Sequence, residues 1–172
     1  DYFNKIKITL NHSIKNYKII KENPIDIKQY KFTVTDKKKE KIRALTEFEL
    51  NDLLSKLDGK DYWITFFAGK CGMRLGEING IIDDGSIDLD NGIINVKRQW
   101  KKIDKKGNHD LGTLKTKNSY RTIPFPIKYI PEFKRYISTC IKDMNNRIFI
   151  DNSNQTTGAR LAYKFRKLGY DI

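Results

Sequence analysis

The sequence predicts an α+β fold that is mainly helical and contains a small antiparallel sheet. Apolar residues recur at helical spacing up to about Ile82, alternate with polar residues between Asp83 and Pro124, and return to helical spacing after Pro126. At 172 residues, the chain is long enough for one sizeable core with a smaller appendage.

The chain opens with a predicted helix from Asn4 to Ile20, because its apolar residues recur at helical spacing. Asn23-Pro24 should end this helix. Segment 25–45 contains the charged run DKKKEK and is interpreted as an exposed linker. One amphipathic helix cannot bury its own apolar face, so residues 1–24 are interpreted as the last helix of a helical domain. Residues 46–172 then form the main domain.

The main domain should contain several helices and one strongly basic antiparallel sheet. Thr46 is a good N-cap for the first of these helices. The expected helices are Glu47–Leu57, a nearly all-apolar and therefore central Asp61–Lys70, a short one from Arg74 to about Ile82, Lys128–Ile141 and Thr157–Leu168. The expected strands are Ser86–Leu89, Ile93–Ile103, His109–Lys115 and Tyr120–Pro124, with a turn at Thr116–Ser119.

The charge points to a polyanionic partner. The net charge is +13, and residues 97–121 carry nine Lys or Arg against two Asp or Glu, while residues 44–96 are net acidic. An A·T-rich genome that favours lysine codons also fits the composition, but it would not concentrate charge in blocks. We therefore predict double-stranded DNA as the partner.

Several other classes of site are not indicated by the sequence. No apolar run approaches the ~20 residues that span a bilayer, so we expect no membrane partner. Cys71 and Cys140 lie in apolar helical patterns and are interpreted as reduced core thiols of a cytoplasmic protein. His12 and His109 are isolated, and we expect neither a metal nor another cofactor.

The stretch AGKCGMRLGEING is the first candidate for chemistry. Arg74 follows a glycine break and opens a helical pattern, where free N–H groups already favour an anion. Because a helix start disfavours a cation, Arg74 should project toward a phosphate or carboxylate. Glu77 shares its helix face and could fix its rotamer. A solvated ion pair in an ordinary helix–turn–helix fits this motif equally well.

The second candidate is the hairpin LKTKNSYRTIP. A lysine at a strand end, beside a polar turn, can be held toward a phosphate, and its pKa falls when it is desolvated near other cations. For Lys117 and Arg121, simple contact with the DNA backbone is the better interpretation. Six basic side chains are expected to make such contacts: Lys97, Arg98, Lys101, Lys102, Lys117 and Arg121.

These motifs, in this order, resemble those of tyrosine recombinases, the phage-integrase type of site-specific recombinase. CGMRLGEINGI resembles the family's first arginine box, and LKTKNSYRTIPFP resembles its lysine hairpin. SIDLDNGIINVKRQW matches the family's small sheet, and ALTEFELNDLL matches the helix that leads into it. The segment IKENP resembles the exit of its helical core-binding domain, so the resemblance covers nearly the whole chain.

The resemblance implies a role for three side chains. Arg74 would bind the non-bridging oxygens of the scissile phosphate and stabilise the transition state. Glu77 would be the buried acid that orients Arg74, and Lys115 would protonate the departing 5′ oxygen. In the family, a tyrosine forms a 3′-phosphotyrosyl link without metal or nucleotide cofactor, and a tetramer assembles on DNA. We expect such a homo-oligomer for a full-length parent.

The sequence departs from the family in its later motifs. Neither histidine begins a His-x-x-Arg pair, and no nucleophilic tyrosine box is recognisable. Tyr170 precedes the place of the missing box and is rejected as the nucleophile. Tyr129, Tyr136 and Tyr163 lie at helical spacings and are interpreted as packing residues. We therefore expect a fragment of a recombinase that is inactive in strand cleavage by itself.

Two alternatives remain open at this point. The first is a non-catalytic DNA-binding accessory protein on a recombinase scaffold. The second is a basic RNA-binding protein in which Arg74 and Glu77 are only structural.

Overall fold

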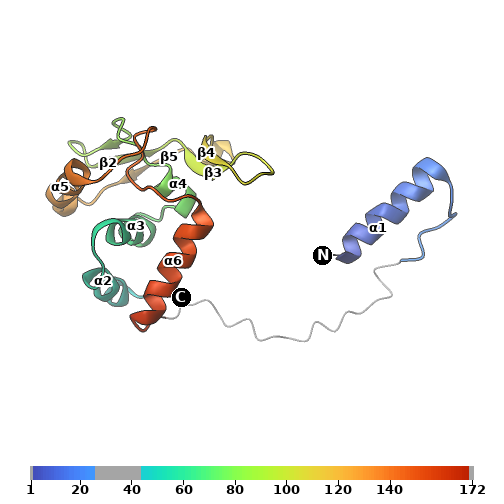
Figure 1. The fold of residues 1–172 in the computed structure, drawn as a ribbon, viewed down its shortest axis with the longest axis horizontal. Coiled ribbons are helices and arrows are strands. Elements are labelled where there is room, and N and C mark those ends of the chain that lie inside the picture. The colour runs from blue at the N-terminus through green and yellow to red at the C-terminus, as the bar shows by residue number, and fades with distance from the viewer. Residues whose placement is uncertain (1, 26–43, 171–172) are drawn as a thin grey trace. The chain divides into compact units, whose positions relative to one another are not determined.

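A computed structural model describes residues 2–25 and 44–170 of the chain. The chain divides into two compact units, Asp1–Ile42 and Arg43–Ile172, both drawn in Figure 1. The expected linker 25–45 lies almost wholly outside the described residues, so the expected division into domains remains a prediction.

The N-terminal unit contains one helical segment. Helix α1 (Tyr2–His12) continues directly into the π-helical turn η1 (Ser13–Tyr17). The expectation of helix up to Ile20 is wrong, because Lys18 adopts a left-handed conformation (φ 53°) and ends it before Asn23-Pro24. Among the side chains of this helix that the structure describes, none of the large apolar ones is buried within its own unit.

The C-terminal unit begins with α2 (Glu47–Ser55), which starts where the sequence predicts. The Thr46 hydroxyl accepts from the Glu49 N–H (3.3 Å), and the Glu49 carboxylate accepts from the Thr46 N–H (2.8 Å). This reciprocal capping box satisfies two N–H groups that the helix itself leaves without partners.

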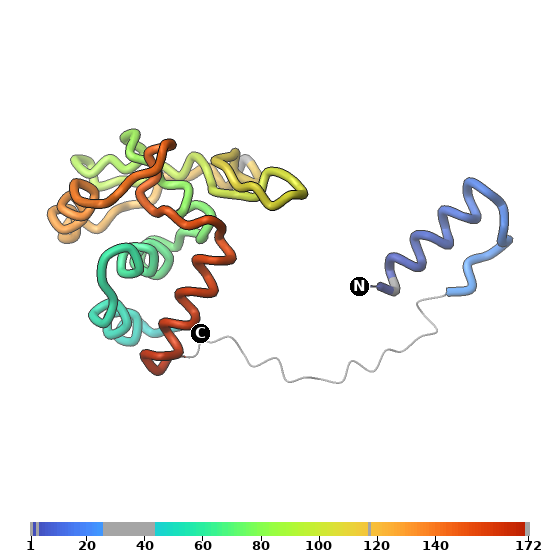
Figure 2. Tube along the Cα trace, viewed as in Figure 1, coloured from blue at the N-terminus to red at the C-terminus, as the bar shows by residue number. Residues whose placement is uncertain are grey.

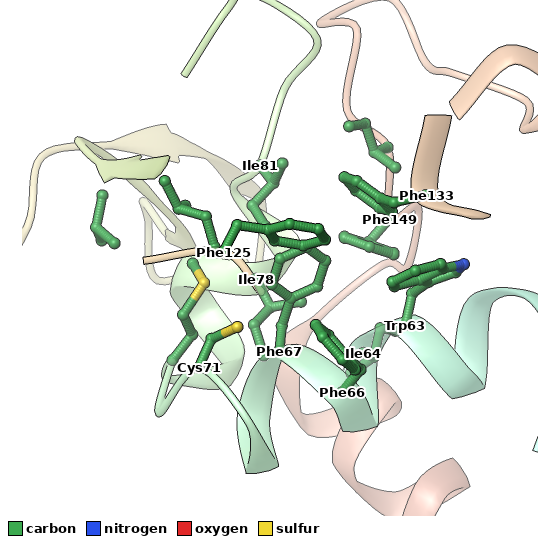
Figure 3. Close-up of a cluster of buried hydrophobic side chains, with 14 of the residues drawn as sticks. Trp63, Ile64, Phe66, Phe67, Cys71, Ile78, Ile81, Phe125, Phe133 and Phe149 are labelled. Carbon is green, nitrogen blue, oxygen red and sulfur yellow. The ribbon is translucent and has the colours of Figure 1, made fainter. Parts of the chain in front are cut away.

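Helix α3 (Gly59–Gly69) is the centre of this unit, as its apolar sequence predicts. Five consecutive residues, Trp63 to Phe67, are buried. The Phe67 ring lies 5.9 Å from Phe125, 5.3 Å from Phe133 and 5.7 Å from Phe149, measured between ring centroids. Figure 3 shows how these aromatic side chains from distant parts of the sequence gather against α3. Aromatic packing of this kind supplies much of the buried apolar area.

The sheet region differs from the single sheet that was expected. Strands β1 (Ile87–Asp88), β2 (Ile93–Val96) and β5 (Arg121–Pro124) form one antiparallel sheet in the order β1-β2-β5. Strands β3 (Gln99–Lys102) and β4 (His109–Gly112) form a separate hairpin. In Figure 2 this hairpin, in yellow, projects from the edge of the C-terminal unit.

The expected continuous strand Ile93–Ile103 is therefore wrong, and the physical reason is Arg98. Alternation would place Arg98 on the same face as the buried Val96 and Trp100. The chain instead breaks after Val96, and the Arg98 guanidinium pairs with Asp84 at 2.6 Å. The strand expected over His109–Lys115 also stops early, at Gly112, and the turn contains a 3₁₀ helix, η2 (Lys117–Ser119).

Two helices complete the unit. Helix α5 (Ile130–Thr139) follows the 3₁₀ turn η3 (Ile127–Tyr129), within the range expected. Helix α6 (Asn154–Lys167) begins three residues before the predicted Thr157, because the Ser153 hydroxyl caps it by accepting from the Thr156 N–H (3.0 Å). The predicted fold class, a mainly helical α+β fold with a small antiparallel three-stranded sheet, is confirmed.

Candidate functional site

Arg74 lies immediately before the short helix α4 (Leu75–Asn79) and points outward. Gly72 adopts a left-handed backbone conformation (φ 62°), which turns the chain after α3. On either side of Gly72, Cys71 and Met73 are buried, whereas 73% of the Arg74 side chain is exposed. Since α4 has only five residues, the guanidinium rather than the helix end supplies the positive charge here.

Glu77 lies on α4 directly beneath Arg74 and is almost completely buried, with 3% of its side chain exposed. It accepts from the Arg74 backbone N–H (2.9 Å) and from Arg74 Nη1 (3.1 Å). Arg121 donates two parallel bonds to the same carboxylate, from Nη1 to Oε1 (3.0 Å) and from Nη2 to Oε2 (2.8 Å). The buried charge is therefore fully hydrogen-bonded, as a buried carboxylate must be.

These contacts decide the charge state of the cluster. Burial acts to raise the pKa of the Glu77 carboxyl, but the bonds donated by Arg121 and Arg74 outweigh it and hold that pKa below its ordinary value. The same pairing raises the pKa of the Arg121 guanidinium. One carboxylate and two guanidinium groups leave the cluster with a net positive charge at neutral pH.

The predicted hairpin meets Arg74 across an open hollow of about 450 Å³. Its lining residues are Gly72, Arg74, Thr116, Asn118, Ser119 and Arg121. Leu114 is buried, and the Thr116 and Ser119 hydroxyls lie 3.0 Å apart across the turn. The turn is therefore anchored on the core side and offers small polar groups to the hollow.

Lys115 is exposed beside Thr116, next to this hollow but outside its lining. Because its neighbour Thr116 lines the hollow together with Arg74, the backbone of Lys115 lies close to the hollow. Lys117 lies in η2, but its side chain is outside the described part of the chain. The catalytic and supporting roles of Arg74, Lys115 and Glu77 remain predictions.

The basic residues expected to contact DNA differ in whether their charged groups are already bonded within the chain. Lys97 and Lys102 are exposed. The Lys101 ammonium donates to the Thr113 carbonyl (3.1 Å), and Arg98 is paired with Asp84. Arg121 is committed to Glu77, which the sequence analysis did not anticipate. Their contacts with DNA remain predictions.

Helix α4 is held firmly by its neighbours, which no pattern in the sequence had indicated. The Asn79 amide donates to Asn154 (2.9 Å) and Thr157 (3.0 Å) on α6. A Cβ atom on Gly80 would lie 2.8 Å from Gln99 Cα, so α4 ends in direct backbone contact with β3. Helix α4 is thus fixed by α6, by β3 and, through Glu77, by β5.

One signal in the sequence could have revealed the inward orientation of Arg121. Alternation along β5 places Arg121 on the same face as Ile123, and both are half-buried whereas Thr122 and Pro124 are exposed. No comparable signal identifies Glu77 as its partner, because 44 residues separate the two.

The tyrosines differ in their surroundings. Tyr129 and Tyr136 pack on the aromatic core, with ring centroids 4.7 Å from Phe66 and 6.0 Å from Phe149 respectively, as expected. Tyr163 was expected to pack as well, but it is 60% exposed on α6, so that interpretation is wrong. Tyr170 donates its hydroxyl hydrogen bond to Asp52 on α2.

The described residues contain neither a membrane-spanning helix nor a cluster of metal ligands. None of the helices in residues 2–25 and 44–170 is long and apolar enough to cross a membrane. Within the same residues, no group of three or more His, Cys, Asp or Glu side chains is arranged to hold a metal ion.

Comparison with known proteins identifies structural neighbours only. No protein-family model matches the chain, and no curated protein matches its sequence. A fragment of the Tn1549 transposon integrase in complex with a circular intermediate DNA is similar, with a TM-score of 0.67 and 22% identity over 96% of this chain. The same integrase in complex with transposon right end DNA gives a TM-score of 0.58 at 21% identity.

The chain spans 57% of the length of these two neighbours. The likeness at this level of identity concerns the fold, and it agrees with the family that the sequence motifs resemble. The described part of the chain therefore shares its fold with the DNA-bound fragment of a transposon integrase, a tyrosine recombinase.

Proposed function

We propose that this chain is part of a DNA-breaking-rejoining site-specific recombinase, an integrase of a mobile element. In this proposal, it binds double-stranded DNA in the cytoplasm and contributes two of the groups that act on the scissile phosphate. A full-length parent would supply the remaining groups and would assemble as a tetramer on DNA.

The observation that carries the proposal is the arrangement around Arg74. The exposed Arg74 guanidinium is bonded through Nη1 to the buried Glu77 carboxylate, and it faces the same hollow as the polar turn Thr116–Ser119. A fixed guanidinium with free donors suits the non-bridging oxygens of a phosphodiester, which it can bind with two parallel bonds. The resemblance of the sequence motifs and the fold of the DNA-bound integrase both support this assignment.

The proposed reaction assigns one step to each side chain. A tyrosine of the parent gives its hydroxyl proton to a basic group of the parent, its oxygen forms a bond to the phosphorus, and the bond from phosphorus to the 5′ oxygen breaks. Arg74 stabilises the charge on the non-bridging oxygens in the transition state. Lys115 gives its proton to the departing 5′ oxygen. Glu77 holds Arg74 in place and does not itself react.

The decisive test uses the full-length parent and a nicked suicide substrate, on which the covalent protein–DNA adduct accumulates. Arg74→Ala should slow adduct formation on the order of 10²–10³-fold, the loss typical when one transition-state donor is removed. Arg135→Ala is the matched control, because that guanidinium is exposed on α5, away from the hollow's lining. Adduct formation at the wild-type rate in Arg74→Ala would contradict the proposed role.

The chain of residues 1–172 should bind duplex DNA weakly and with strong salt dependence. Binding through phosphate contacts releases counterions, so affinity should fall steeply between low and high salt. Fluorescence anisotropy with a labelled duplex measures this, and Lys102→Gln should lower the salt slope by about one. Binding that does not change with salt would contradict the proposed basic surface.

Three further outcomes separate the alternatives. Residues 1–172 by themselves should form no covalent adduct, because a His-x-x-Arg pair does not occur in their sequence. A parent that carries neither this pair nor a nucleophilic tyrosine would instead be a DNA-binding accessory protein. Duplex RNA that displaces the DNA at lower concentration than duplex DNA would favour the RNA-binding alternative.

A further inference from the structure

Two arginines share the Glu77 carboxylate unequally. Arg121 binds both oxygens, whereas the Arg74 guanidinium binds only one of them, through Nη1. Arg121 is also the more enclosed side chain, with 29% exposed against 73% for Arg74. The bidentate position beside the buried charge is therefore held by the arginine to which the family resemblance assigns no role.

Arg121 also donates hydrogen bonds to two backbone carbonyls. Its Nη1 donates to Ser119 (3.2 Å) in the turn, and its Nη2 donates to Gly72 (3.3 Å) at the bend before Arg74. Gly72 and Arg121 are 49 residues apart in the sequence. The guanidinium thus links the bend that presents Arg74 to the turn that faces it.

Arg74 is left with free donors as a result. Among the residues that the structure describes, its guanidinium makes only the bond to Glu77 Oε1. A carboxylate that already accepts two parallel bonds from Arg121 has little capacity to draw Arg74 into a second one.

We propose that Arg121 is a positioning residue for the anion site at Arg74. It occupies the bidentate position on Glu77, so that Arg74 remains turned outward with its donors available to a tetrahedral oxyanion. The inference rests on the proposed function, in which Arg74 binds a phosphate, and it assigns Arg121 a role in the site other than contact with the DNA backbone.

Removing Arg121 should let Glu77 compete for Arg74. The buried carboxylate would lose the partner that binds both of its oxygens, and a buried charge without partners is costly. The Arg74 guanidinium is the nearest remaining cation and would turn inward to replace it. Anion binding at Arg74 would then weaken, although Arg74 itself is unchanged.

This competition depends on the charge of Glu77 and should therefore respond to pH. In the variant without Arg121, burial is opposed only by Arg74, so the pKa of Glu77 should rise above its wild-type value. As the pH falls through that raised pKa, Glu77 becomes neutral, releases Arg74, and anion affinity recovers.

The wild type should show such a change only at lower pH than the variant, because the bonds from Arg121 hold the pKa of its Glu77 below the ordinary value. Lys97 and Arg98 line the other side of the Glu77 environment. Arg98 is itself paired with Asp84.

The experiment titrates the 172-residue chain with inorganic sulfate, a tetrahedral dianion whose charge is constant between pH 4 and pH 7. The Arg74 Nε–H resonance reports sulfate binding, and the Glu77 carboxyl ¹³C resonance reports its ionisation. Arg121→Gln should bind sulfate about tenfold more weakly than wild type at pH 7, the effect of about one charge-assisted hydrogen bond. Arg135→Gln removes the same charge from α5 and should match the wild type.

A second pair of variants separates positioning from mere support of the fold. The double variant Glu77→Gln, Arg121→Gln removes the competing carboxylate and should bind sulfate more tightly than Arg121→Gln. Arg121→Lys keeps the charge but cannot make two parallel bonds, so its affinity should be intermediate. It also carries the test if Arg121→Gln does not fold.

Two results would overturn the role of Arg121. The first is that Arg121→Gln or Arg121→Lys has the same sulfate affinity and the same pH profile as the wild type. The second is that the double variant binds sulfate no more tightly than Arg121→Gln. A wild-type Arg74 resonance that does not respond to sulfate would instead contradict the proposed function itself.

Discussion

Gly80→Ala should destabilise the C-terminal unit, because Gly80 ends α4 against the backbone of β3. A Cβ atom there would lie 2.8 Å from Gln99 Cα and 2.9 Å from Trp100 N, where an ordinary contact is 3.4 Å or more. Helix and strand would have to separate by about half an ångström, and backbone atoms cannot rotate away as a side chain can. The backbone conformation of Gly80 (φ −92°) suits alanine, so the effect would come from packing alone.

The expected loss is ~2 kcal/mol in the free energy of unfolding, in the usual range for overpacking. For a unit of this size, it corresponds to a decrease in Tm of roughly 5–10 °C. Thermal and urea unfolding followed by tryptophan fluorescence measure this directly, because both Trp63 and Trp100 lie in the buried core of the unit.

Gly158→Ala is the matched control, since it adds the same methyl group inside α6. There the new Cβ would lie 3.7 Å from Leu75 Cδ2, an ordinary contact. Alanine is the better helix former, so this variant should be more stable by ~0.5–1 kcal/mol. A Gly80→Ala protein as stable as wild type would refute the inference that α4 and β3 are locked together at this point.

Two further predictions concern stability and reactivity. Glu77→Gln should cost about 2 kcal/mol at pH 7, less than a fully buried pair would because Arg74 is largely exposed. Since the pKa of Glu77 is lowered in the folded chain, this contribution to stability is present above about pH 4.5 and is lost as the pH falls through the folded value. The free energies of unfolding of variant and wild type, measured with urea, should therefore converge in acid. Burial raises the pKa of the Cys71 thiol to about 11, so Cys71 should react with Ellman's reagent much more slowly at pH 8 than the half-buried Cys140 does; equal rates in the folded chain would contradict the burial of Cys71.

The helices of the C-terminal unit could be predicted from the sequence because their signals are local. A capping residue such as Thr46 and apolar spacing over ten residues suffice to place α2 and α3. The break between β2 and β3 could not be predicted, because it depends on Arg98 finding Asp84, 14 residues earlier in the chain. Alternation alone does not reveal where a charged residue makes burial of a strand face impossible.

The sequence predicted residues of the candidate site but not the ion pair that joins Glu77 to Arg121. The motif placed Arg74 and Glu77 on one short helix; in the structure Glu77 lies on α4, whereas Arg74 is the N-cap residue immediately before it. The pairing of Glu77 on α4 with Arg121 on β5 joins positions 44 residues apart, which only the tertiary fold brings together. From the sequence alone, Arg121 was therefore expected to contact the DNA backbone, although its guanidinium is bound to Glu77.

The separation of β3–β4 from the three-stranded sheet has a consequence for how such proteins can diverge. The base of the hairpin is immobilised by Gly80 and by Trp100, whose ring stacks on the Arg147 guanidinium at 3.4 Å. Its far end, Lys105 and Lys106, shares no ladder with β2 or β5. Under the proposed function, insertions or charge changes at that tip would alter how much of a duplex is covered, while the bonding at Glu77 would stay intact. The extent of the proposed DNA contact and the geometry of the anion site are thus free to evolve separately.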